Sequence, residues 1–404
     1  MPKGWEWCRL GDINDIARGG SPRPIKDYLT DEENGINWIK IGDTTKDGKY
    51  INSVKEKIKP EGAKKSRMVH KGDFLLTNSM SFGRPYILNV DGCIHDGWLV
   101  ISPIGNAYTT DFLYYLLSSA FAFEQFANAA SGGVVTNLNS DKVADTYFPI
   151  PPLVEQIRIV TEIEHWFVLI DIIEQGKRKL QISIKQVKNK ILDLAIHGKL
   201  VPQDPNDEPA SELLKRINPK AEITSDNEHY ENLPRTWCVN SLGDIFNHNT
   251  GKALNSSNQD GFMKEYLTTS NVYWNKFDLS VIKQMPFKEN EMNKYTVTKG
   301  DLLVCEGGDI GRAAIWNFNY DICIQNHLHR LRPKGSICVS FFYYALKQLK
   351  EKRLIGGQGI GLMGLSSREL HKILIPVPPL VEQERIVDRI ESLYHVLNTI
   401  EESL

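Results

Sequence analysis

Apolar side chains recur every three or four residues over two segments of the chain, and this spacing predicts two long helices. The first helix is expected over about residues 152–197. Pro152 suits a helix start, and Gly198 can adopt the left-handed conformation that often ends a helix. Its apolar stripe has the spacing of a coiled-coil seam and consists of Leu153, Ile157, Val160, Ile163, Phe167, Ile170, Leu180, Ile184, Val187 and Ile191.

The second helix is expected within residues 377–404 and is shorter than the first. Neither helix can bury its apolar stripe alone, so pairing of the two helices is the economical arrangement. The alternative is that each stripe packs against its own domain. The stripe of the second helix consists of Leu380, Val387, Ile390 and Leu397.

The rest of the chain contains short apolar runs separated by glycine- and proline-rich turns, a pattern typical of strands. We therefore predict two mixed α/β domains, at residues 1–150 and 228–376. A central helical spacer with its linker covers residues 151–227, and the second spacer covers residues 377–404. The fold class is α+β.

The chain repeats itself. Residues 149–160 (PIPPLVEQIRIV) and 376–387 (PVPPLVEQERIV) are identical at ten of twelve positions. Other pairs keep nearly the same spacing, which predicts an internal duplication with pseudo-two-fold character. These pairs are Trp7-Cys8 with Trp237-Cys238, Leu10-Gly11-Asp12-Ile13 with Leu242-Gly243-Asp244-Ile245, and Gly83-Arg84 with Gly311-Arg312.

Charge is balanced over the whole chain, with a formal net charge of −2, which argues against a strongly basic nucleic-acid binder. One local excess exists, because residues 40–71 contain ten basic and four acidic side chains. Such a patch could neutralise DNA phosphates. An ordinary solvated surface is the alternative.

The six cysteines lack the C-x-x-C spacing of a metal or redox site, so we expect reduced thiols. No apolar run is long enough to span a membrane, and the N-terminal residues lack the apolar core of a signal peptide. These features predict a cytoplasmic protein that does not associate with membranes.

Motifs for catalysis are missing from the sequence. There is no Asn/Asp-Pro-Pro-aromatic loop for adenine methylation and no phosphate-binding G-x-x-x-x-G-K-[ST] loop. Asp301 and Glu306 could suggest a nuclease, but the repeat partner of Glu306 is Asn78, which cannot supply the same charge. His327 and His329 could share a strand face, but no third metal ligand is evident. We expect a chain without catalytic residues, metal or cofactor.

The duplicated PxPPLVEQ sequence and the stretch Ala195–Leu214 (AIHGKLVPQDPNDEPASELL) resemble the specificity subunits of type I restriction–modification enzymes. The resemblance covers essentially the whole chain. It implies two target-recognition domains, each reading one half of a split sequence in double-stranded DNA. It also implies that the helices form an antiparallel coiled coil, which sets the distance between the two halves.

The resemblance further implies partner subunits. Two methylation subunits would dock on the helical regions, and restriction subunits would join them. S-adenosylmethionine, ATP and magnesium would then be bound by these partners. Three alternatives remain: a specificity subunit of another restriction type with the same fold, a coiled-coil scaffold that does not bind DNA, and an autonomous DNA-modifying enzyme.

The duplication also suggests which residues contact DNA. Domains with one framework and different targets should agree at structural positions and differ at base-reading positions. The polar residues before the shared Gly-Arg differ, and amides and acids suit the edges of adenine and cytosine, respectively. We therefore predict base contacts from Asn78, Ser79, Ser81, Glu306 and Asp309.

Arg84 and Arg312 are expected to grip phosphate or to brace this loop. The alternative for the whole segment is an ordinary loop, in which the sequence differences between the two domains reflect only evolutionary drift. Further candidates for DNA contact lie in polar turns at corresponding places in the two domains. They are Ser21, Arg23, Lys40, Thr44, Thr136, Asn137, Lys252, Thr269, Asn271 and Gln358. For the methylation subunits, the candidate docking surface is the Lys199–Pro205 segment together with helix residues outside the apolar stripe.

Overall fold

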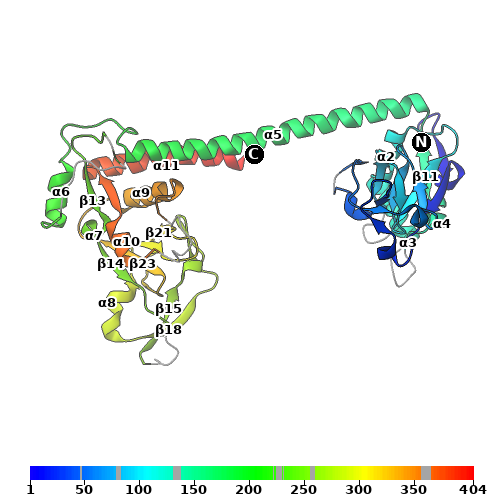
Figure 1. The fold of residues 1–404 in the computed structure, drawn as a ribbon. Helices are drawn as coiled ribbons and strands as arrows, with labels where there is room; N and C mark the ends of the chain where they lie inside the picture. The colour runs from blue at the N-terminus through cyan, green and yellow to red at the C-terminus, as the bar shows by residue number, and fades with distance from the viewer. Residues whose placement is uncertain are drawn as a thin grey trace. The chain divides into compact units, whose positions relative to one another are not determined.

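The computed structural model of the chain forms two compact units, Met1–Glu174 and Gln175–Leu404 (Figure 1). The boundary between them falls inside one long helix, α5 (Leu153–Ile196). The structure describes residues 1–45, 48–78, 83–130, 138–221, 223, 230, 232–254, 260–355 and 365–404.

The described part of unit 1 contains two five-stranded sheets, with strand orders β2-β11-β8-β9-β5 and β3-β6-β4-β10-β7. A two-stranded sheet, β1-β12, joins the start of the unit to its end. The strands are β1 (Glu6–Arg9), β2 (Asn14–Arg18), β3 (Leu29–Thr30), β4 (Ile36–Ile39), β5 (Tyr50–Ile51), β6 (Lys57–Ile58), β7 (Arg67–Val69), β8 (Phe74–Thr77), β9 (Pro85–Leu88), β10 (Gly92–Ile94), β11 (Trp98–Pro103) and β12 (Tyr147–Ile150).

The described part of unit 2 has sheets with the orders β14-β23-β20-β21 and β18-β15-β22-β19, together with the pairs β13-β24 and β16-β17. Its strands are β13 (Cys238–Ser241), β14 (Phe246–Thr250), β15 (Phe262–Leu267), β16 (Val272–Tyr273), β17 (Lys276–Phe277), β18 (Lys283–Phe287), β19 (Thr296–Val297), β20 (Leu302–Cys305), β21 (Ala313–Ile315), β22 (Ile322–Ile324), β23 (Leu328–Pro333) and β24 (Leu374–Val377).

The short helices cover the sheets and connect the strands. The segment at about residues 110–130 forms two helices, α2 and α3, of which the first ends at Leu117 and the second begins at Ala120. Its counterpart in unit 2, α9, is continuous. The helices other than α5 are α1 (Pro60–Ala63), α2 (Thr110–Leu117), α3 (Ala120–Ala130), α4 (Ser140–Ala144), α6 (Ala210–Ile217), α7 (Leu242–Ile245), α8 (Met292–Tyr295), α9 (Val339–Glu351), α10 (Ser367–Lys372) and α11 (Leu380–Glu402).

Strand β8 shows why its apolar run is continuous rather than alternating. Leu76 belongs to the core cluster that includes Phe126 of α3, whereas the neighbouring Leu75 belongs to the cluster that includes Ile94 of the second sheet. Successive side chains of a strand point to opposite faces. Both faces of β8 are covered, so every position favours an apolar residue.

Corresponding elements of the two units share several backbone features. Strand β4 runs parallel to β10, as β15 runs parallel to β22. In each unit, the glycine directly after β2 or β14 lies against a backbone carbonyl group, at the same place in the sheet. A Cβ on Gly19 would lie 2.2 Å from the His95 oxygen, and a Cβ on Gly251 would lie 2.2 Å from the Gln325 oxygen. Only glycine permits this approach at either position.

The strand register corrects one pairing from the sequence analysis. Trp7 lies opposite Pro149, whereas Val239 lies opposite Pro376 in the equivalent pair of strands. The counterpart of Trp237 is therefore Trp5, not Trp7. The preceding turns agree, because the Trp5 amide donates to the Pro2 carbonyl (3.3 Å) and the Trp237 amide donates to the Pro234 carbonyl (2.9 Å). The sequence analysis paired Trp7 with Trp237, 230 positions further along the chain, because both residues directly precede a cysteine.

Within unit 2, α11 runs antiparallel to the C-terminal half of α5 (Figure 1). The Tyr394 hydroxyl donates to the Lys188 carbonyl (3.1 Å), and the Lys188 ammonium contacts the Glu401 carboxylate (2.6 Å). Lys177 contacts the carbonyl oxygen of Leu404. The end of α11 therefore pairs with the part of α5 between Lys177 and Lys188.

The predicted apolar stripe is buried only in part. On the C-terminal half of α5, Ile184 and Ile191 are buried, whereas Leu180 and Val187 are exposed. This half also packs on the domain core, so its buried face is broader than a seam. On α11, Val387 and Ile390 are buried, and Leu380 and Leu397 are half-buried. In unit 1, Val160 is buried, Ile163 is half-buried, and the exposed members are Leu153, Ile157, Phe167 and Ile170.

The repeated Pro-Pro-Leu-Val-Glu-Gln sequence has a structural explanation in its glutamine. Gln156 is fully buried at the start of α5, where its Nε2 donates to the carbonyls of Ala107 and Pro151 (both 2.9 Å) and its Oε1 accepts from the Thr109 amide (2.8 Å). Gln383 does the same on α11. It donates to Pro378 and accepts from the Cys338 amide at the start of α9 (both 2.9 Å). Each glutamine thus fastens a long helix to its own domain.

We predict that Gln156→Leu lowers the free energy of unfolding by about 2–4 kcal/mol, because the Thr109 amide and the carbonyls of Ala107 and Pro151 lose their hydrogen bonds to the Gln156 side chain. Urea unfolding followed by circular dichroism measures this change. Gln181→Leu, at an exposed position of the same helix, is the control. Equal effects of the two substitutions would contradict the assigned role.

Candidate nucleic-acid interface

In unit 1, three of the predicted contact residues lie around one pocket of about 340 Å³, whose polar lining residues include Ser21, Arg23, Lys40, His95 and Asp96. The Ser21 hydroxyl donates to Asp96 Oδ1 (2.6 Å), and the exposed Arg23 guanidinium lies 3.5 Å from Oδ2. The close approach at Gly19 brings this turn next to the loop after β10. The structure therefore brings together residues that are far apart in the sequence.

Asp96 organises this pocket. The hydrogen bond from Ser21 and the positive charge of Arg18 help to hold the pKa of the Asp96 carboxyl below its usual range. Burial lowers the pKa of the adjacent His95, which also accepts from the Ile41 amide (3.2 Å). At neutral pH the pocket therefore presents a carboxylate beside a neutral imidazole, with the largely exposed Arg23 guanidinium at its edge.

Lys40 and Thr44 make internal contacts near this pocket. The Lys40 ammonium pairs with Glu56, and the Thr44 hydroxyl donates to the Ile41 carbonyl (2.8 Å). Both residues remain half-exposed. An ion pair between half-exposed groups is weak, so Lys40 could exchange Glu56 for a phosphate at little cost.

The lysine-rich stretch of unit 1 is less free than its sequence suggests. The Lys49 ammonium pairs with Asp111 (2.6 Å) and lies over the Tyr115 ring, and the Lys65 ammonium contacts the Tyr28 hydroxyl (2.5 Å). These contacts attach the stretch to its own domain. The local positive charge remains, but part of it is already matched.

Two candidates in unit 2 belong to the framework. Lys252 is buried, and its ammonium binds Glu291 (2.6 Å) and the Pro286 carbonyl (2.9 Å). Asn271 is also buried. Its oxygen accepts from the Thr268 amide, and its nitrogen donates to the carbonyls of Asp278 and Val281. Neither side chain is placed to reach a base, so we assign both to structural roles.

The loop between β20 and β21 places its charged groups differently. The Arg312 guanidinium donates to the Thr269 carbonyl (2.5 Å) and stacks 4.8 Å from the Tyr273 ring centre, so Arg312 braces the loop. Asp309 is exposed and pairs with Lys350 (3.0 Å). Glu306 is half-exposed, and one of its oxygens lies 3.6 Å from His327 Nδ1. Both acids remain accessible from solvent.

The equivalent loop of unit 1 is described only at its ends. Asn78 is fully buried, and its Nδ2 donates to the Asp96 carbonyl (2.8 Å), so its side chain braces the pocket and does not face a base. Arg84 is exposed, and its backbone amide donates to the Thr77 hydroxyl (3.0 Å). The predicted contacts that lie outside the described residues are Ser79, Ser81, Thr136, Asn137 and Gln358.

A chain of three imidazoles lies beside the Glu306 loop. His371 Nε2 is 2.7 Å from His248 Nδ1, His248 Nε2 is 2.9 Å from His329 Nδ1, and His329 Nε2 is 2.7 Å from the Leu365 carbonyl. A carbonyl only accepts, so each imidazole must carry its proton on Nε2. The sequence analysis missed this chain, because no local spacing connects three histidines on β14, β23 and α10.

Burial and the neighbouring imidazoles lower the pKa of His248 to about 3, and burial lowers the pKa of His329. In the unfolded chain, the His248 imidazole takes up a proton near its ordinary pKa of 6.5. In the folded chain, it does not take up a proton at that pH. Stability is therefore fully present above about pH 6.5 and is lost as the pH falls toward 3.

We expect the free energy of unfolding to decline between pH 6.5 and pH 4, with a smaller slope in His248→Phe because that variant has no such proton uptake. Urea titrations at several pH values measure both slopes. His395→Phe, at an exposed position on α11, should keep the wild-type slope. A His248 imidazole NMR signal that titrates near pH 6 would contradict the assignment.

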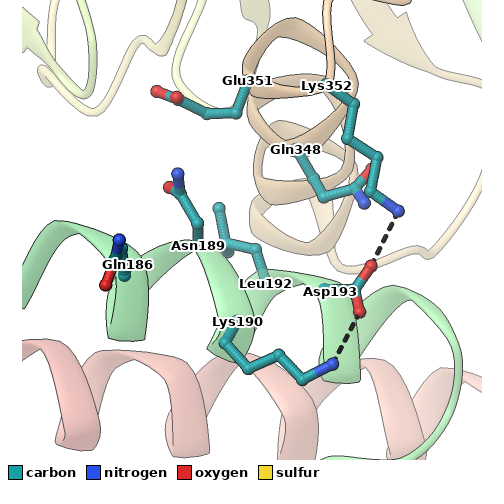
Figure 2. A pocket seen from close by; sticks show the side chains of 8 residues that line it. All are labelled: Gln186, Asn189, Lys190, Leu192, Asp193, Gln348, Glu351 and Lys352. Carbon is teal, nitrogen blue, oxygen red and sulfur yellow. Dashed lines mark hydrogen bonds and ion pairs between the residues drawn. The ribbon is translucent and has the colours of Figure 1, made fainter. Parts of the chain in front are cut away.

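A second pocket, of about 280 Å³, lies between α5 and α9 in unit 2 (Figure 2). Asp193 on α5 binds Lys352, just after α9 (2.7 Å), and Lys190 on its own helix (3.2 Å). Gln348 of α9 also lines this pocket. Both polar atoms of its amide are buried, and neither has a hydrogen-bond partner among the described residues. Such an amide costs stability.

Gln348→Leu should therefore raise the free energy of unfolding by about 1 kcal/mol, because an apolar side chain of similar size removes the unpaired amide. Thermal and urea unfolding of the full chain test this. Gln186→Leu, at an exposed position that lines the same pocket, should change stability little. A loss of stability on Gln348→Leu would show that the amide is hydrogen-bonded in solution.

Among the described residues, no group of three His, Cys, Asp or Glu side chains is arranged to hold a metal ion. The described helices also include none with a stretch long and apolar enough to cross a bilayer.

Comparison with known proteins identifies the family. The model of the type I restriction modification DNA specificity domain matches residues 2–182 and, again, residues 234–404. The chain belongs to this family. One relative, the type I restriction enzyme EcoAI specificity subunit of Escherichia coli, is 24% identical, and the match covers 99% of this chain and 79% of that protein. The family and its relatives indicate no catalytic domain.

Solved structures share the specificity-family fold. The HsdS subunit from Thermoanaerobacter tengcongensis has a TM-score of 0.62 and 20% identity, with 100% of this chain and 92% of that one covered. A chain from a study of complex assembly and conformational transition in the type I R-M system has a TM-score of 0.68 and 20% identity, with 100% and 93% covered.

Proposed function

We propose that this specificity-family chain reads a bipartite sequence in double-stranded DNA, with one half bound by each unit. The observation that carries the proposal is that the family model matches twice, onto units with corresponding sheets. The accessible groups nevertheless differ between the units. Unit 1 offers Arg23 near Asp96, and unit 2 offers the acids Glu306 and Asp309. Shared frameworks with different polar surfaces suit two different half-sites.

The helices would supply spacing and assembly. In this proposal, α5 and α11 act as an antiparallel coiled coil, and their remaining exposed faces, with the Lys199–Pro205 segment, dock two methylation subunits. Restriction subunits would join these partners in the cytoplasm. S-adenosylmethionine, ATP and magnesium would be bound by the partners, and this chain would perform no chemistry itself.

A methylome map tests the proposal. The chain is expressed with the methylation subunit encoded beside it in a host without DNA methylation, and N6-methyladenine is located by sequencing. Methylation at one split motif, present only with both chains, is the expected result. Two soluble, co-purifying chains that methylate no specific motif would contradict DNA reading.

The same map tests the candidate base contacts. Glu306→Ala and Asp309→Ala should relax or change one half of the motif and leave the other half unchanged, since each good base contact contributes about 1–3 kcal/mol of discrimination. Glu384→Ala, at an exposed acid on α11, is the matched control and should leave both halves unchanged. If all three variants methylate the wild-type motif, Glu306 and Asp309 do not contact the bases of the target.

A further inference from the structure

Both units possess one equivalent face that, among the described residues, is covered only in unit 2. In unit 2, this face is formed by Trp237, Glu382 and Arg385. The segment that covers it, residues 198–218, is called the cap below. Gln203 of the cap binds Glu382, whose other oxygen accepts from the Trp237 indole (2.9 Å), and Asp207 of the cap binds Arg385 through both oxygens (3.2 and 2.5 Å).

Apolar contacts complete the cap. Ala210, Leu213 and Leu214 of α6 are buried. Ile217, at the end of α6, lies so close to Gly335 that a Cβ there would be 2.5 Å from it. The cap therefore attaches by one amide, one carboxylate and one short apolar helix.

Unit 1 has the same groups at the equivalent positions. Glu155 and Arg158 of α5 correspond to Glu382 and Arg385 in the repeated sequence, and Trp5 corresponds to Trp237. The Trp5 indole nitrogen is buried, and no described residue forms a hydrogen bond with it. Arg158 is exposed, and no described residue forms an ion pair with it. A Cβ on Gly105, the counterpart of Gly335, would meet nothing within 4 Å.

We propose that the face of unit 1 formed by Trp5, Glu155 and Arg158 is a docking site for a segment of a partner protein that resembles the cap. That segment carries an amide side chain for Glu155, a carboxylate for Arg158 and a short apolar helix that packs beside Gly105. With Glu155 held by the amide, its other oxygen can accept from the Trp5 indole, as Glu382 does in unit 2. This proposal does not depend on DNA reading.

The cap of the same chain cannot fill both faces. Its apolar residues are already buried against unit 2, and Asp207 is already paired with Arg385. Residues 198–218 of this chain are thus committed to unit 2, and we assign the face of unit 1 to a partner protein because its exposed Arg158 and the buried Trp5 indole call for complementary polar groups.

A peptide of residues 198–218 carrying a fluorophore is the probe, and its anisotropy is measured against the full chain. Binding is expected, with Arg158→Glu weakening it at least about tenfold through like-charge repulsion. A peptide with Asp207→Lys should regain affinity for the Arg158→Glu chain. Lys185→Glu, at another exposed cation of α5, is the control that should bind like the wild type.

Three results would overturn the proposal. The first is no binding at peptide concentrations up to about 1 mM, since weaker association provides little free energy. The second is equal binding by the wild-type and Arg158→Glu chains, which places the peptide elsewhere. The third comes from sedimentation of the chain alone. A dimer that Arg158→Glu abolishes would make a second copy the occupant.

Discussion

The buried glutamine at the start of each long helix is the interaction on which the rest of the structure depends. Gln156 and Gln383 each link the first turn of a helix to the backbone at the start of a domain helix. The first and last strands of each domain pair immediately before this point, β1 with β12 and β13 with β24. A buried amide satisfied on both its donor and acceptor sides resists rotation, so each domain is held firmly on its own helix.

The attachment of each domain to its helix belongs to a framework that the two units share, whereas their accessible polar groups differ. The close passages at Gly19 and Gly251 and the glutamine anchors take the same form in both units, and the central strands of the sheets correspond. The accessible polar groups differ, with Arg23 near Asp96 in unit 1 and two acids in the β20–β21 loop of unit 2. A framework held by backbone hydrogen bonds lets these loops change at little cost in stability, because loop side chains make few core contacts.

Several candidate contacts proved to be part of this framework. The sequence analysis predicted DNA contacts from Asn78, Lys252 and Asn271 because they are polar residues in loops. In the structure, each is buried and forms hydrogen bonds within its own unit. Sequence alone does not separate these cases, because the same polar residue in a loop suits a hydrogen bond to a buried carbonyl as well as a position facing solvent. The histidine chain was missed for a related reason, since it joins β14, β23 and α10 only after the domain has folded.

The sequence by itself determined the mixed domains, the two helices and the repeated helix start, because periodicity and identical motifs are local properties of the chain. It could not determine how much of the apolar stripe is buried, since that depends on which elements lie beside each turn. Nor could it identify Trp5 as the partner of Trp237, because two tryptophans precede Cys8 and only the strand register distinguishes them. Tertiary structure decided these points, because burial and pairing arise from contacts between residues far apart in the chain.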